Sequence, residues 1–327
     1  MRTSCSLGSL LSIGEIISCS KRLSRTDVHT IWVPETWGME NFAMLGAVSG
    51  AARSARIGSS IVNVYSRSPA VIAMGAATVD AISGGRLVLG LGASSPAIVN
   101  GLHGMPYREP LRRVRETTDI VRLAVSGRKI DYSGRIFSLH GFRLLIKPVR
   151  SNIPIYLAAV NRGMIRLAWG IGDGVILYLR PADEMRSTIG AMRREFSRDI
   201  DVACQLIACV SDDETAAMER ARRTISFYVA VGRVYRDFLA ANGFEEETAA
   251  IYSEFRKAGT DKMHRLVPDE MVRALAVAGS PGACRQRLAA FRDAGLDLPI
   301  MQFNPVGGMN TADSFEIFAE TFFGDAE

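Results

Sequence analysis

Cysteine and histidine are scarce in this sequence, and neither residue is spaced for a metal site. The five cysteines form no Cys-x-x-Cys pair, and the four histidines stand far apart along the chain. An odd number of cysteines argues against a disulfide framework, and the missing spacings argue against a structural zinc site. We therefore expect reduced, mostly buried thiols, no bound metal and a cytoplasmic location.

Lysine is also rare, because it supplies only five of the 39 basic residues and arginine supplies the rest. The net charge is +5. The densest basic segment, Arg108–Arg122, mixes arginine with acidic residues at helical spacing, as a solvated helix face does. Its arginines are not interleaved with aromatic residues, so nucleic acid is not favoured as a partner. A mild positive excess fits attraction of an anionic cofactor or substrate.

Long apolar segments and flexible linkers are absent as well. No apolar run reaches the roughly 18 residues that a membrane helix needs, so we expect no membrane partner. Near the N-terminus, Glu15 interrupts the apolar stretch, which favours a first strand and helix over a signal peptide. No Pro/Gly/Ser-rich linker or low-complexity tract divides the chain. We therefore predict one domain spanning residues 1–327.

The sequence does contain a repeated alternation of short apolar runs and amphipathic helical patterns. Several of the runs are uniformly apolar, which is typical of parallel strands buried on both faces. Eight such units predict an α/β fold, a closed TIM (β/α)8 barrel. The eight predicted strands are Ser4–Leu7, Thr30–Val33, Ile57–Val62, Leu87–Leu91, Ile155–Ala158, Gly174–Leu177, Val202–Ala208 and Leu298–Phe303.

Two intervals interrupt this alternation. Asp131–Leu144 has the pattern of a small inserted hairpin. Residues 212–273 are rich in charge and helical pattern, which predicts a helical excursion near the cofactor end of the barrel. Helix starts are clearer elsewhere: Ser68 followed by Pro69 places a cap before a first-turn proline and predicts a helix that extends to Ile82.

The stretch Asp80–Ser95, DAISGGRLVLGLGASS, has two interpretations. One is a dinucleotide fingerprint, but Gly90-x-Gly92 lacks the third glycine and no acidic residue follows about 20 positions later. In a barrel, by contrast, Gly92, Ala93 and Ser94 lie at the catalytic rim, where backbone amides and hydroxyls can hold an anion. A simple tight turn between strand and helix is the remaining alternative.

Four blocks resemble the bacterial-luciferase-like superfamily. The first is Ile57–Gly92, IGSSIVNVYSRSPAVIAMGAATVDAISGGRLVLGLG, and the others are Ile31–Gly38, Asn152–Ile176 and Ala278–Ile300. They occur in the family's order and cover nearly the whole chain. The pattern Asn-x-Tyr-x-Arg-x-Pro at Asn63–Pro69 is similar to that of archaeal methylenetetrahydromethanopterin reductases, in the branch that uses the deazaflavin F420.

This resemblance implies a TIM barrel with the cofactor at the C-terminal ends of the strands. It implies a non-prolyl cis peptide at Ser60–Ile61, beneath the cofactor ring, and a phosphate site at Ala159–Gly163, at a helix N-terminus. Glu35, Asn63 and Tyr65 are candidate catalytic residues. The predicted cofactor-binding residues are Glu35, Thr36, Ser60, Ile61, Asn63, Gly92, Ala93, Ser94, Ala158, Ala159, Val160, Asn161, Arg162 and Gly163.

The chain departs from the family pattern at two places that matter for proton transfer. Thr36 stands where several deazaflavin enzymes have histidine, and Ser94 and Ser95 stand where some have glutamate. The resemblance therefore does not identify the proton donor. Trp37 and Arg162 are further candidates, for ring packing and for pairing with a phosphate or carboxylate respectively.

The function implied is hydride transfer between reduced F420 and a small organic substrate, with a tetrahydropterin as the sharpest guess and an alcohol, a quinone or an imine as alternatives. Two other functions stay open: an FMN-dependent luciferase-like monooxygenase and a non-catalytic flavin-binding barrel. Relatives are commonly dimers or tetramers, so the resemblance also implies a homo-oligomer.

Overall fold

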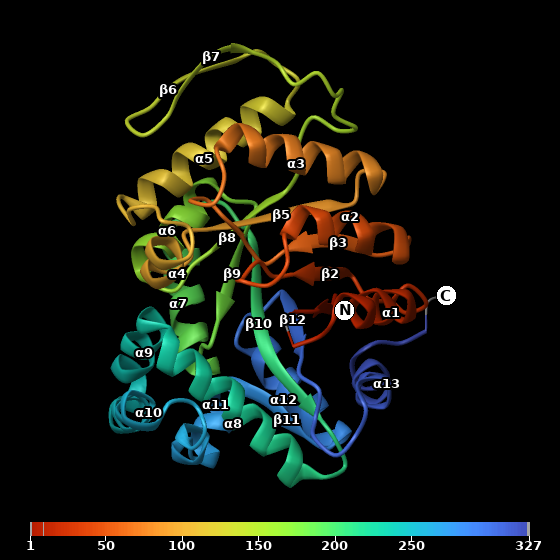
Figure 1. The fold of residues 1–327 in the computed structure, drawn as a ribbon, viewed down its shortest axis with the longest axis vertical. Helices are drawn as coiled ribbons and strands as arrows, with labels where there is room; N and C mark the ends of the chain where they lie inside the picture. Colours follow the sequence, from red (N-terminus) through yellow and green to blue (C-terminus); the bar gives the residue numbers. More distant parts are fainter. Residues whose placement is uncertain (1, 9, 326–327) are drawn as a thin grey trace.

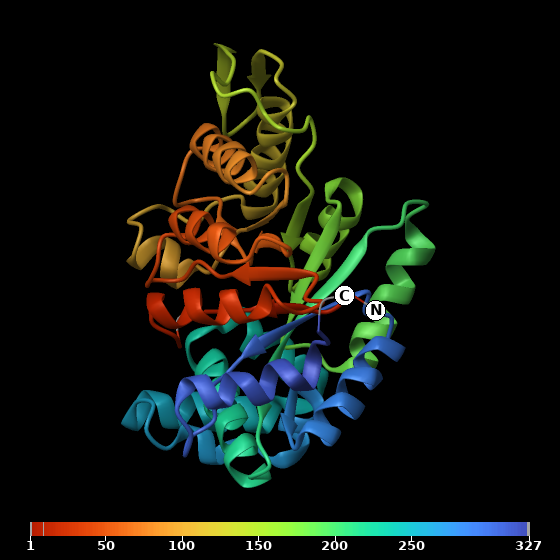
Figure 2. The ribbon, with the colours of Figure 1, turned by 90° about the vertical axis from the view of Figure 1, so that its right-hand side faces the viewer.

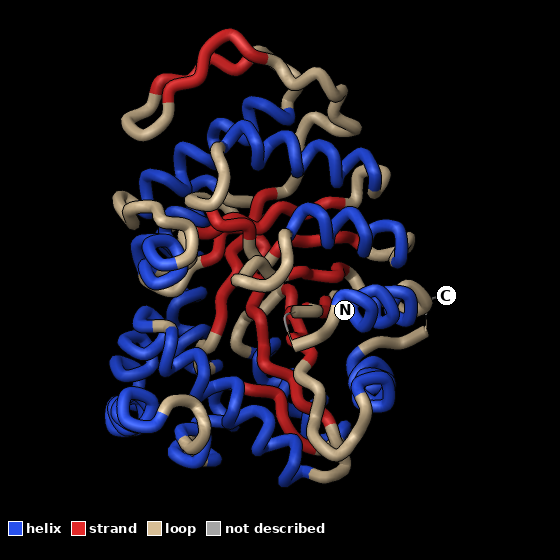
Figure 3. Tube along the Cα trace, in the orientation of Figure 1, coloured by secondary structure: helices blue, strands red, loops and turns tan. Residues whose placement is uncertain are grey.

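The computed structural model describes residues 2–8 and 10–325, and its centre is a closed ring of eight parallel strands surrounded by helices (Figures 1 and 3). Neighbouring strands pair in the order β1-β2-β3-β5-β8-β9-β10-β12, and β12 pairs back to β1. The predicted TIM barrel is confirmed. The ring strands are β1 (Ser4–Ser6), β2 (Thr30–Val33), β3 (Arg56–Ser59), β5 (Leu87–Gly92), β8 (Ile155–Ala158), β9 (Gly174–Tyr178), β10 (Asp201–Val210) and β12 (Leu298–Phe303).

Helices follow most strands and cover the outside of the ring (Figure 3). Within the described residues, none has the length and apolar character needed to cross a membrane. The α-helices are α1 (Ile13–Leu23), α2 (Asn41–Ala51), α3 (Pro69–Ile82), α4 (Pro96–Gly101), α5 (Pro110–Val125), α6 (Arg162–Ile171), α7 (Ala182–Glu195), α8 (Glu214–Val231), α9 (Arg233–Leu239), α10 (Glu245–Ala258), α11 (Asp269–Leu275), α12 (Pro281–Asp293) and α13 (Thr311–Phe322).

Local sequence signals explain several helix boundaries. Ser68 caps α3 as predicted, since its side chain accepts a hydrogen bond from the Val71 backbone N–H at 3.3 Å. α1 begins with a capping box, in which Ser12 and Glu15 each satisfy the other's backbone N–H. The chain leaves α3 through Gly84, which has a left-handed φ of 67°.

The two predicted interruptions are both present. A hairpin of β6 (Ile130–Ser133) and β7 (Ser138–Phe142) lies against α5 and projects beyond the ring of helices (Figures 1 and 2). The helical excursion consists of α8 to α11 with two short turns, η1 (Ala240–Phe244) and η2 (Met263–Leu266). It packs over the C-terminal half of β10, so it covers one side of the barrel mouth.

Two strands depart from the prediction. The predicted strand Ile57–Val62 is broken, because β3 ends at Ser59 and a separate strand β4 (Val62–Asn63) pairs with the end of β5. The strand β11 (Ala276–Gly279) was missed. It is four residues long and pairs with Ile207–Val210, where β10 extends beyond its contact with β9. Only that tertiary pairing makes the segment a strand.

The lower part of the barrel is filled by apolar side chains. Trp32 and Tyr156 meet at 5.7 Å between ring centroids, and Trp32 occupies the space that a side chain at Gly58 would need. The remaining buried members of this interior cluster are Val88, Ile176, Ala203, Leu298 and Ile300. Because this part is a packed core, a ligand can enter the barrel only from the C-terminal ends of the strands.

Candidate active site

Polar, uncharged side chains replace the apolar core toward the C-terminal ends of the strands. Gln302 lies two residues beyond the interior Ile300, and Gln205 lies two beyond Ala203, so both glutamines face the barrel interior. The Tyr178 hydroxyl donates to Gln302 Oε1 at 2.8 Å, and Gln205 Nε2 donates to the same oxygen at 3.2 Å. Both glutamines are partly exposed. The barrel mouth is therefore accessible and polar.

Three tyrosines form one wall of this mouth. The rings of Tyr178, Tyr228 and Tyr235 meet edge to face, with centroid separations of 4.8, 5.6 and 5.8 Å. Burial raises the pKa of all three hydroxyls. They stay protonated at neutral pH and can only donate or accept hydrogen bonds there. Sequence reasoning missed the three tyrosines and the two glutamines. For Tyr178, Gln205 and Gln302, the inward register along β9, β10 and β12 was a usable signal.

A cis peptide bond joins Ser60 to Ile61, which confirms the prediction at this position. It lies between β3 and β4, where the chain swings across the end of β5. A Cβ atom at Gly90 would lie 1.9 Å from the Ser59 carbonyl oxygen, and one at Gly92 would lie 2.9 Å from the Ile61 side chain. The glycines of the Gly-Leu-Gly stretch therefore make room for this neighbouring segment, and no dinucleotide fingerprint is involved.

Two buried polar atoms beside this segment have no hydrogen-bond partner within the described residues, Ser60 Oγ and Asn63 Nδ2. The orientation of the Asn63 amide is set by its oxygen, which accepts from the Tyr65 backbone N–H at 2.9 Å. Buried polar groups are nearly always satisfied, so an unpaired pair at a barrel mouth indicates a position for a ligand.

Glu35 lies close to this segment, but its carboxylate is already paired. It accepts from Arg67 at 2.6 and 2.9 Å and from the Asn63 backbone N–H at 3.0 Å, and its side chain is only 7% exposed. Arg67 also pairs with Glu40. Glu35 thus holds Asn63 in place and is not a free acid or base. Neighbouring Thr36 is partly exposed at the rim.

The Tyr65 side chain is also already engaged in contacts within the protein. Its hydroxyl donates to the Arg108 carbonyl at 2.7 Å, its ring stacks on Tyr107 at 5.2 Å, and the Arg113 guanidinium lies 4.5 Å over its ring. Burial is the main cause that raises the pKa of Tyr65 to about 12. With its proton committed to a carbonyl, Tyr65 fastens the loop before α5 and is a poor proton donor to substrate.

The loop after β8 carries the predicted phosphate site. Asn161 caps α6, since its side chain accepts from the Met164 N–H at 3.0 Å. The Ala159 N–H donates to Ile176 O and is already satisfied. The Arg162 side chain is 77% exposed and lies 4.0 Å from Glu195, on the outside of the barrel. It is therefore not directed into the mouth, whereas the start of α6 at Gly163 lies at the rim.

Arg180 is a further residue that sequence reasoning missed. Its side chain is 2% exposed, pairs with Glu184 at 2.5 Å, donates to the Val160 carbonyl and lies 4.3 Å from the Phe238 ring centroid. Leu179 before it has a left-handed φ of 50°. The signal was available: an arginine two residues after the buried strand GVILY needs a buried partner.

Some of the predicted cofactor-binding residues lie together at the barrel mouth, and others do not. Ile61, Gly92 and Ala158 meet at the mouth, because a Cβ at Gly92 would lie 2.9 Å from Ile61 and 3.2 Å from the Ala158 Cβ. Ser60 and Asn63 are beside them. The next rim residues are Ala93, which is buried, and Ser94, which has a left-handed φ of 58°. Two of the candidate groups, Glu35 and Arg162, are instead paired with other side chains.

A family model described as luciferase-like monooxygenase matches residues 2–298. The chain belongs to this family. Among curated relatives, a 5,10-methylenetetrahydromethanopterin reductase of Archaeoglobus fulgidus is 29% identical over 286 residues, 84% of this chain and 85% of that protein. A Mycobacterium tuberculosis protein named as a coenzyme F420-dependent oxidoreductase is 26% identical, over 83% of this chain and 86% of its own.

The luciferase-like fold also matches solved structures. A coenzyme F420-dependent tetrahydromethanopterin reductase from Methanopyrus kandleri superposes with a TM-score of 0.86 at 20% identity, covering 98% of each chain. This likeness extends over the barrel and the helical excursion together. The resemblance to the luciferase-like superfamily stated from the sequence is confirmed.

Proposed function

We propose that this luciferase-like protein is an F420-dependent oxidoreductase that transfers a hydride between the reduced deazaflavin and a small organic substrate of the 5,10-methylenetetrahydromethanopterin class. The observation that carries the proposal is the barrel mouth, where Ser60 Oγ and Asn63 Nδ2 are buried, without partners among the described residues, beside the partly exposed Ile61 and Ala158. The names of the relatives, a reductase and an F420-dependent oxidoreductase, support the choice of chemistry.

The residues at the mouth fit a flat, heteroatom-rich ring. Ile61 and Ala158 meet over Gly92, which has no side chain, so they offer an apolar surface on which a ring can lie. Asn63 Nδ2 supplies an unpaired donor, and Ser60 Oγ supplies a donor or an acceptor. When bound there, the deazaflavin supplies the hydride. The chain supplies the orientation of the ring toward the substrate.

The side chains on the substrate side of the mouth are uncharged hydrogen-bonding groups. The Tyr178 hydroxyl donates to Gln302, and the raised pKa of Tyr178 keeps its proton in place at neutral pH. Trp37 from the loop after β2 lies 6.1 Å from Phe227 of α8, so aromatic rings from two elements border the entrance. A neutral substrate with an extended ring system suits this lining better than a charged one.

Two other functions remain as alternatives. The family model is described as a monooxygenase, so FMN is the alternative cofactor and oxygen the alternative acceptor. A non-catalytic flavin-binding barrel is the alternative of another class, because a fold does not fix a function. Glu35 and Tyr65 have structural partners, so neither is assigned as the proton donor.

A paired titration tests the proposal. The purified apo-protein is titrated with F420 and with FMN under nitrogen, and ligand fluorescence reports binding. We expect tight binding of F420 and weak binding of FMN, followed by oxidation of reduced F420 when 5,10-methylenetetrahydromethanopterin is added. Preference for FMN with oxygen uptake would assign the monooxygenase function instead. Binding without turnover on any acceptor would favour the non-catalytic barrel.

A pair of variants tests the site itself. Asn63→Ala removes the unpaired donor, and we expect it to weaken F420 binding by about tenfold, the effect of one hydrogen bond worth about 1.4 kcal/mol. Asn152→Ala is the matched control, because Asn152 is exposed and outside the barrel. Equal affinities for both variants and the wild type contradict this assignment of Asn63.

We also propose that the protein forms a homodimer or homotetramer. α2 contains no charged residue, and the one charged residue of α3, Asp80, is buried and paired with Arg150. Val71, Met74 and Ile82 of α3 are nevertheless exposed. An uncharged, apolar surface on two adjacent helices is typical of a subunit interface. Light scattering should report an oligomer that Met74→Glu converts to monomer; a monomeric wild type contradicts the proposal.

The cytoplasm is the compartment that the cysteines favour. All five are buried and free. Burial raises the pKa of Cys19, Cys204 and Cys284 to about 12, so thiolates are scarce at neutral pH. Such thiols suit a reducing compartment. Fractionation of cells that express the tagged chain should recover it with cytoplasmic markers, and recovery in a secreted or membrane fraction contradicts the location.

A further inference from the structure

A cavity of about 450 Å³ lies at the N-terminal ends of the strands, at the end of the barrel opposite the mouth. Its lining residues precede or begin β1, β3, β8, β9, β10 and β12, so most of the ring contributes to it. Its volume is within the range of sites that hold small organic ligands. Tyr156 borders the packed core, because its ring meets Trp32 at 5.7 Å. This N-terminal pocket is therefore separated from the mouth by the core.

Two lining residues of opposite charge face each other across the N-terminal pocket. Arg56 lies two residues before Gly58, where the interior Trp32 fills the space of a side chain. Asp201 lies two residues before the interior Ala203. Side chains alternate along a strand, so Arg56 and Asp201 both point inward. In the ring, β5, β8 and β9 lie between β3 and β10, which puts the two residues on opposite sides.

Some charges of the pocket already have partners within the protein. Asp201 accepts from two nitrogens of the Arg2 guanidinium, each at 2.9 Å, and from the Tyr156 hydroxyl. Asp173 pairs with Arg122 at 2.8 Å. These contacts join strands from different sides of the ring, and they leave Arg2, Asp173 and Asp201 without a free charge for a ligand.

Arg56 lines the pocket and forms no ion pair among the described residues. It is partly buried, and burial lowers its pKa, with the nearby Arg150 and Arg2 acting in the same direction. The facing Asp201 is already bound to Arg2. A guanidinium in this position favours an anion, and a carboxylate matches its planar fork.

Two carboxylates on the other side of the pocket are weakly paired. Asp297 accepts from the Val202 backbone N–H at 3.0 Å, but its contact with Arg193 is 3.5 Å long. Asp199 is 81% exposed and lies 3.9 Å from Arg193. Burial raises the pKa of Asp297, and the charges of Asp201 and Asp199 add to this effect. A cation beside Asp297 would offset both causes.

The cation that suits these carboxylates is organic. Among the described residues, no group of three metal-ligating side chains is placed to hold a metal ion. An ammonium group needs only one or two carboxylates and donates hydrogen bonds to them. Asp297 and Asp199 together offer such a pair of acceptors at one wall of the pocket.

Ser4 gives an independent sign of a ligand at this end of the barrel. The Thr3 hydroxyl accepts from Arg292 of the outer helix α12 at 2.6 Å, so the side chains of Arg2 and Ser4 point inward. Ser4 is 0% exposed, and its Oγ has no hydrogen-bond partner among the described residues. Buried polar groups are nearly always satisfied, which indicates that a polar group from outside the chain completes this region.

We propose that the N-terminal pocket binds a small organic zwitterion. Its carboxylate pairs with Arg56, and its ammonium pairs with Asp297 and Asp199 across the barrel. The two ends of the ligand are separated by a flexible chain, because the charges that hold them come from opposite sides of the ring. No residue of the barrel mouth lines this pocket, so the inference is independent of the proposed function.

A series of simple probes tests the charge requirement. The purified protein is titrated by calorimetry at low salt with 6-aminohexanoate, in which a methylene chain separates the two charges. Hexanoate and hexylamine each carry one of these charges, and glycine carries both on adjacent atoms. We expect 6-aminohexanoate to bind about tenfold tighter than any of the other three, since only this probe makes both ion pairs. It should also raise the thermal midpoint, because it binds the folded barrel.

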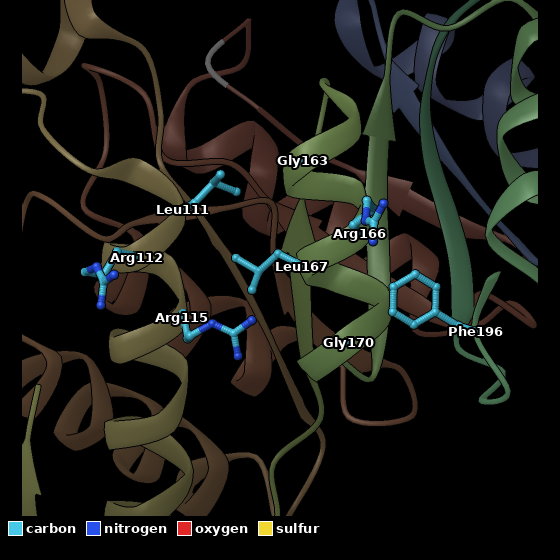
Figure 4. Close-up of a pocket in the computed structure, with 8 residues that line it drawn as sticks. All are labelled: Leu111, Arg112, Arg115, Gly163, Arg166, Leu167, Gly170 and Phe196. Carbon is cyan, nitrogen blue, oxygen red and sulfur yellow. The ribbon is translucent and has the colours of Figure 1, made fainter.

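Two variants assign the ends of the ligand separately. Arg56→Gln should weaken 6-aminohexanoate and hexanoate by about tenfold and leave hexylamine unchanged. Asp297→Asn keeps an acceptor for Val202, and it should weaken 6-aminohexanoate and hexylamine but not hexanoate. Arg115→Gln is the matched control, because this exposed arginine lines a different cavity, the groove between α5 and α6 on the outside of the barrel (Figure 4). It should bind every probe as the wild type does.

The remaining outcomes overturn the assignment. Equal affinities of the wild type for all four probes would show that the pocket does not read both charges. Unchanged binding of 6-aminohexanoate in both Arg56→Gln and Asp297→Asn would place the probe elsewhere. Displacement of 6-aminohexanoate by F420 would place it at the mouth. The thermal midpoint without ligand checks that each variant folds, and the wild-type series decides the question if one of them does not. Failure of F420 to bind affects only the proposed function.

Discussion

Arg180, two residues after the end of β9, donates a hydrogen bond to the carbonyl oxygen of Val160, which follows β8. The same guanidinium pairs with Glu184 of α7 and lies over the Phe238 ring of α9. One buried side chain therefore connects the loop at the start of α6 with the helical excursion. These three contacts need the planar guanidinium of arginine, because the compact ammonium of a lysine could not reach all three partners.

Replacing Arg180 tests its contribution. Arg180→Met leaves the Glu184 carboxylate, which is only 20% exposed, without its partner. We expect a loss of about 2–3 kcal/mol in the free energy of unfolding by urea, with an intermediate loss for Arg180→Lys. Arg186→Met is the matched control, because the Arg186–Asp183 pair lies on the surface of the same helix and contributes about 0.5 kcal/mol. Equal losses for both positions contradict this role.

Gly90 provides a second test, of close packing. Gly90→Ala puts a methyl group 1.9 Å from the Ser59 carbonyl oxygen, a backbone atom that cannot rotate away. Overpacking of this kind should cost about 2–3 kcal/mol of stability. Gly46→Ala in α2 is the control, since nothing lies within 4 Å of the added Cβ, and it should be neutral or stabilising by up to about 1 kcal/mol. A Gly90→Ala protein as stable as wild type would show that β3 can shift.

Glu35 and Glu40 allow a comparison around one arginine. Both pair with Arg67, but the Glu35 side chain is 7% exposed and that of Glu40 is 51% exposed. We expect Glu35→Gln to lower stability by about 2–3 kcal/mol and to weaken F420 binding, because Asn63 loses a charged acceptor. Glu40→Gln should cost less than about 1 kcal/mol and leave binding unchanged. Urea unfolding and fluorescence titration measure the two effects; the reverse order refutes the assignment.

His29 should make stability depend on acid pH. Burial first, and then the nearby Arg56 and Arg2, lower the pKa of His29 from 6.5 to about 4. Over this interval the unfolded chain binds a proton that the folded chain does not. Stability is thus complete above pH 6.5 and declines as the pH falls toward 4. Urea midpoints between pH 7.5 and 4.5 should fall less steeply for His29→Gln than for wild type. Parallel slopes would exclude His29 as the cause.

Several parts of the site followed from the sequence, and others did not. The cis bond at Ser60–Ile61 was predicted because a 36-residue block matched a family in which that position is special. By contrast, Glu35 was a candidate for cofactor contact, and the structure pairs it with Arg67, 32 residues away. Which side chain pairs with the Glu35 carboxylate depends on how the loop after β2 packs against the loop before α3. Local sequence patterns do not determine that packing.

The sequence by itself determined the barrel. Uniformly apolar runs such as Leu87–Leu91 are typical of strands buried on both faces of a parallel sheet covered by helices, so the apolar runs and the helical patterns between them predicted a barrel of eight strands. Only the tertiary structure decided what each mouth residue does. The need for glycine at Gly90, the partner of Arg180 and the four-residue strand β11 all depend on atoms brought close from distant segments. The hydrophobic pattern of a segment predicts whether that segment is buried, whereas contacts between distant segments form only when the chain folds.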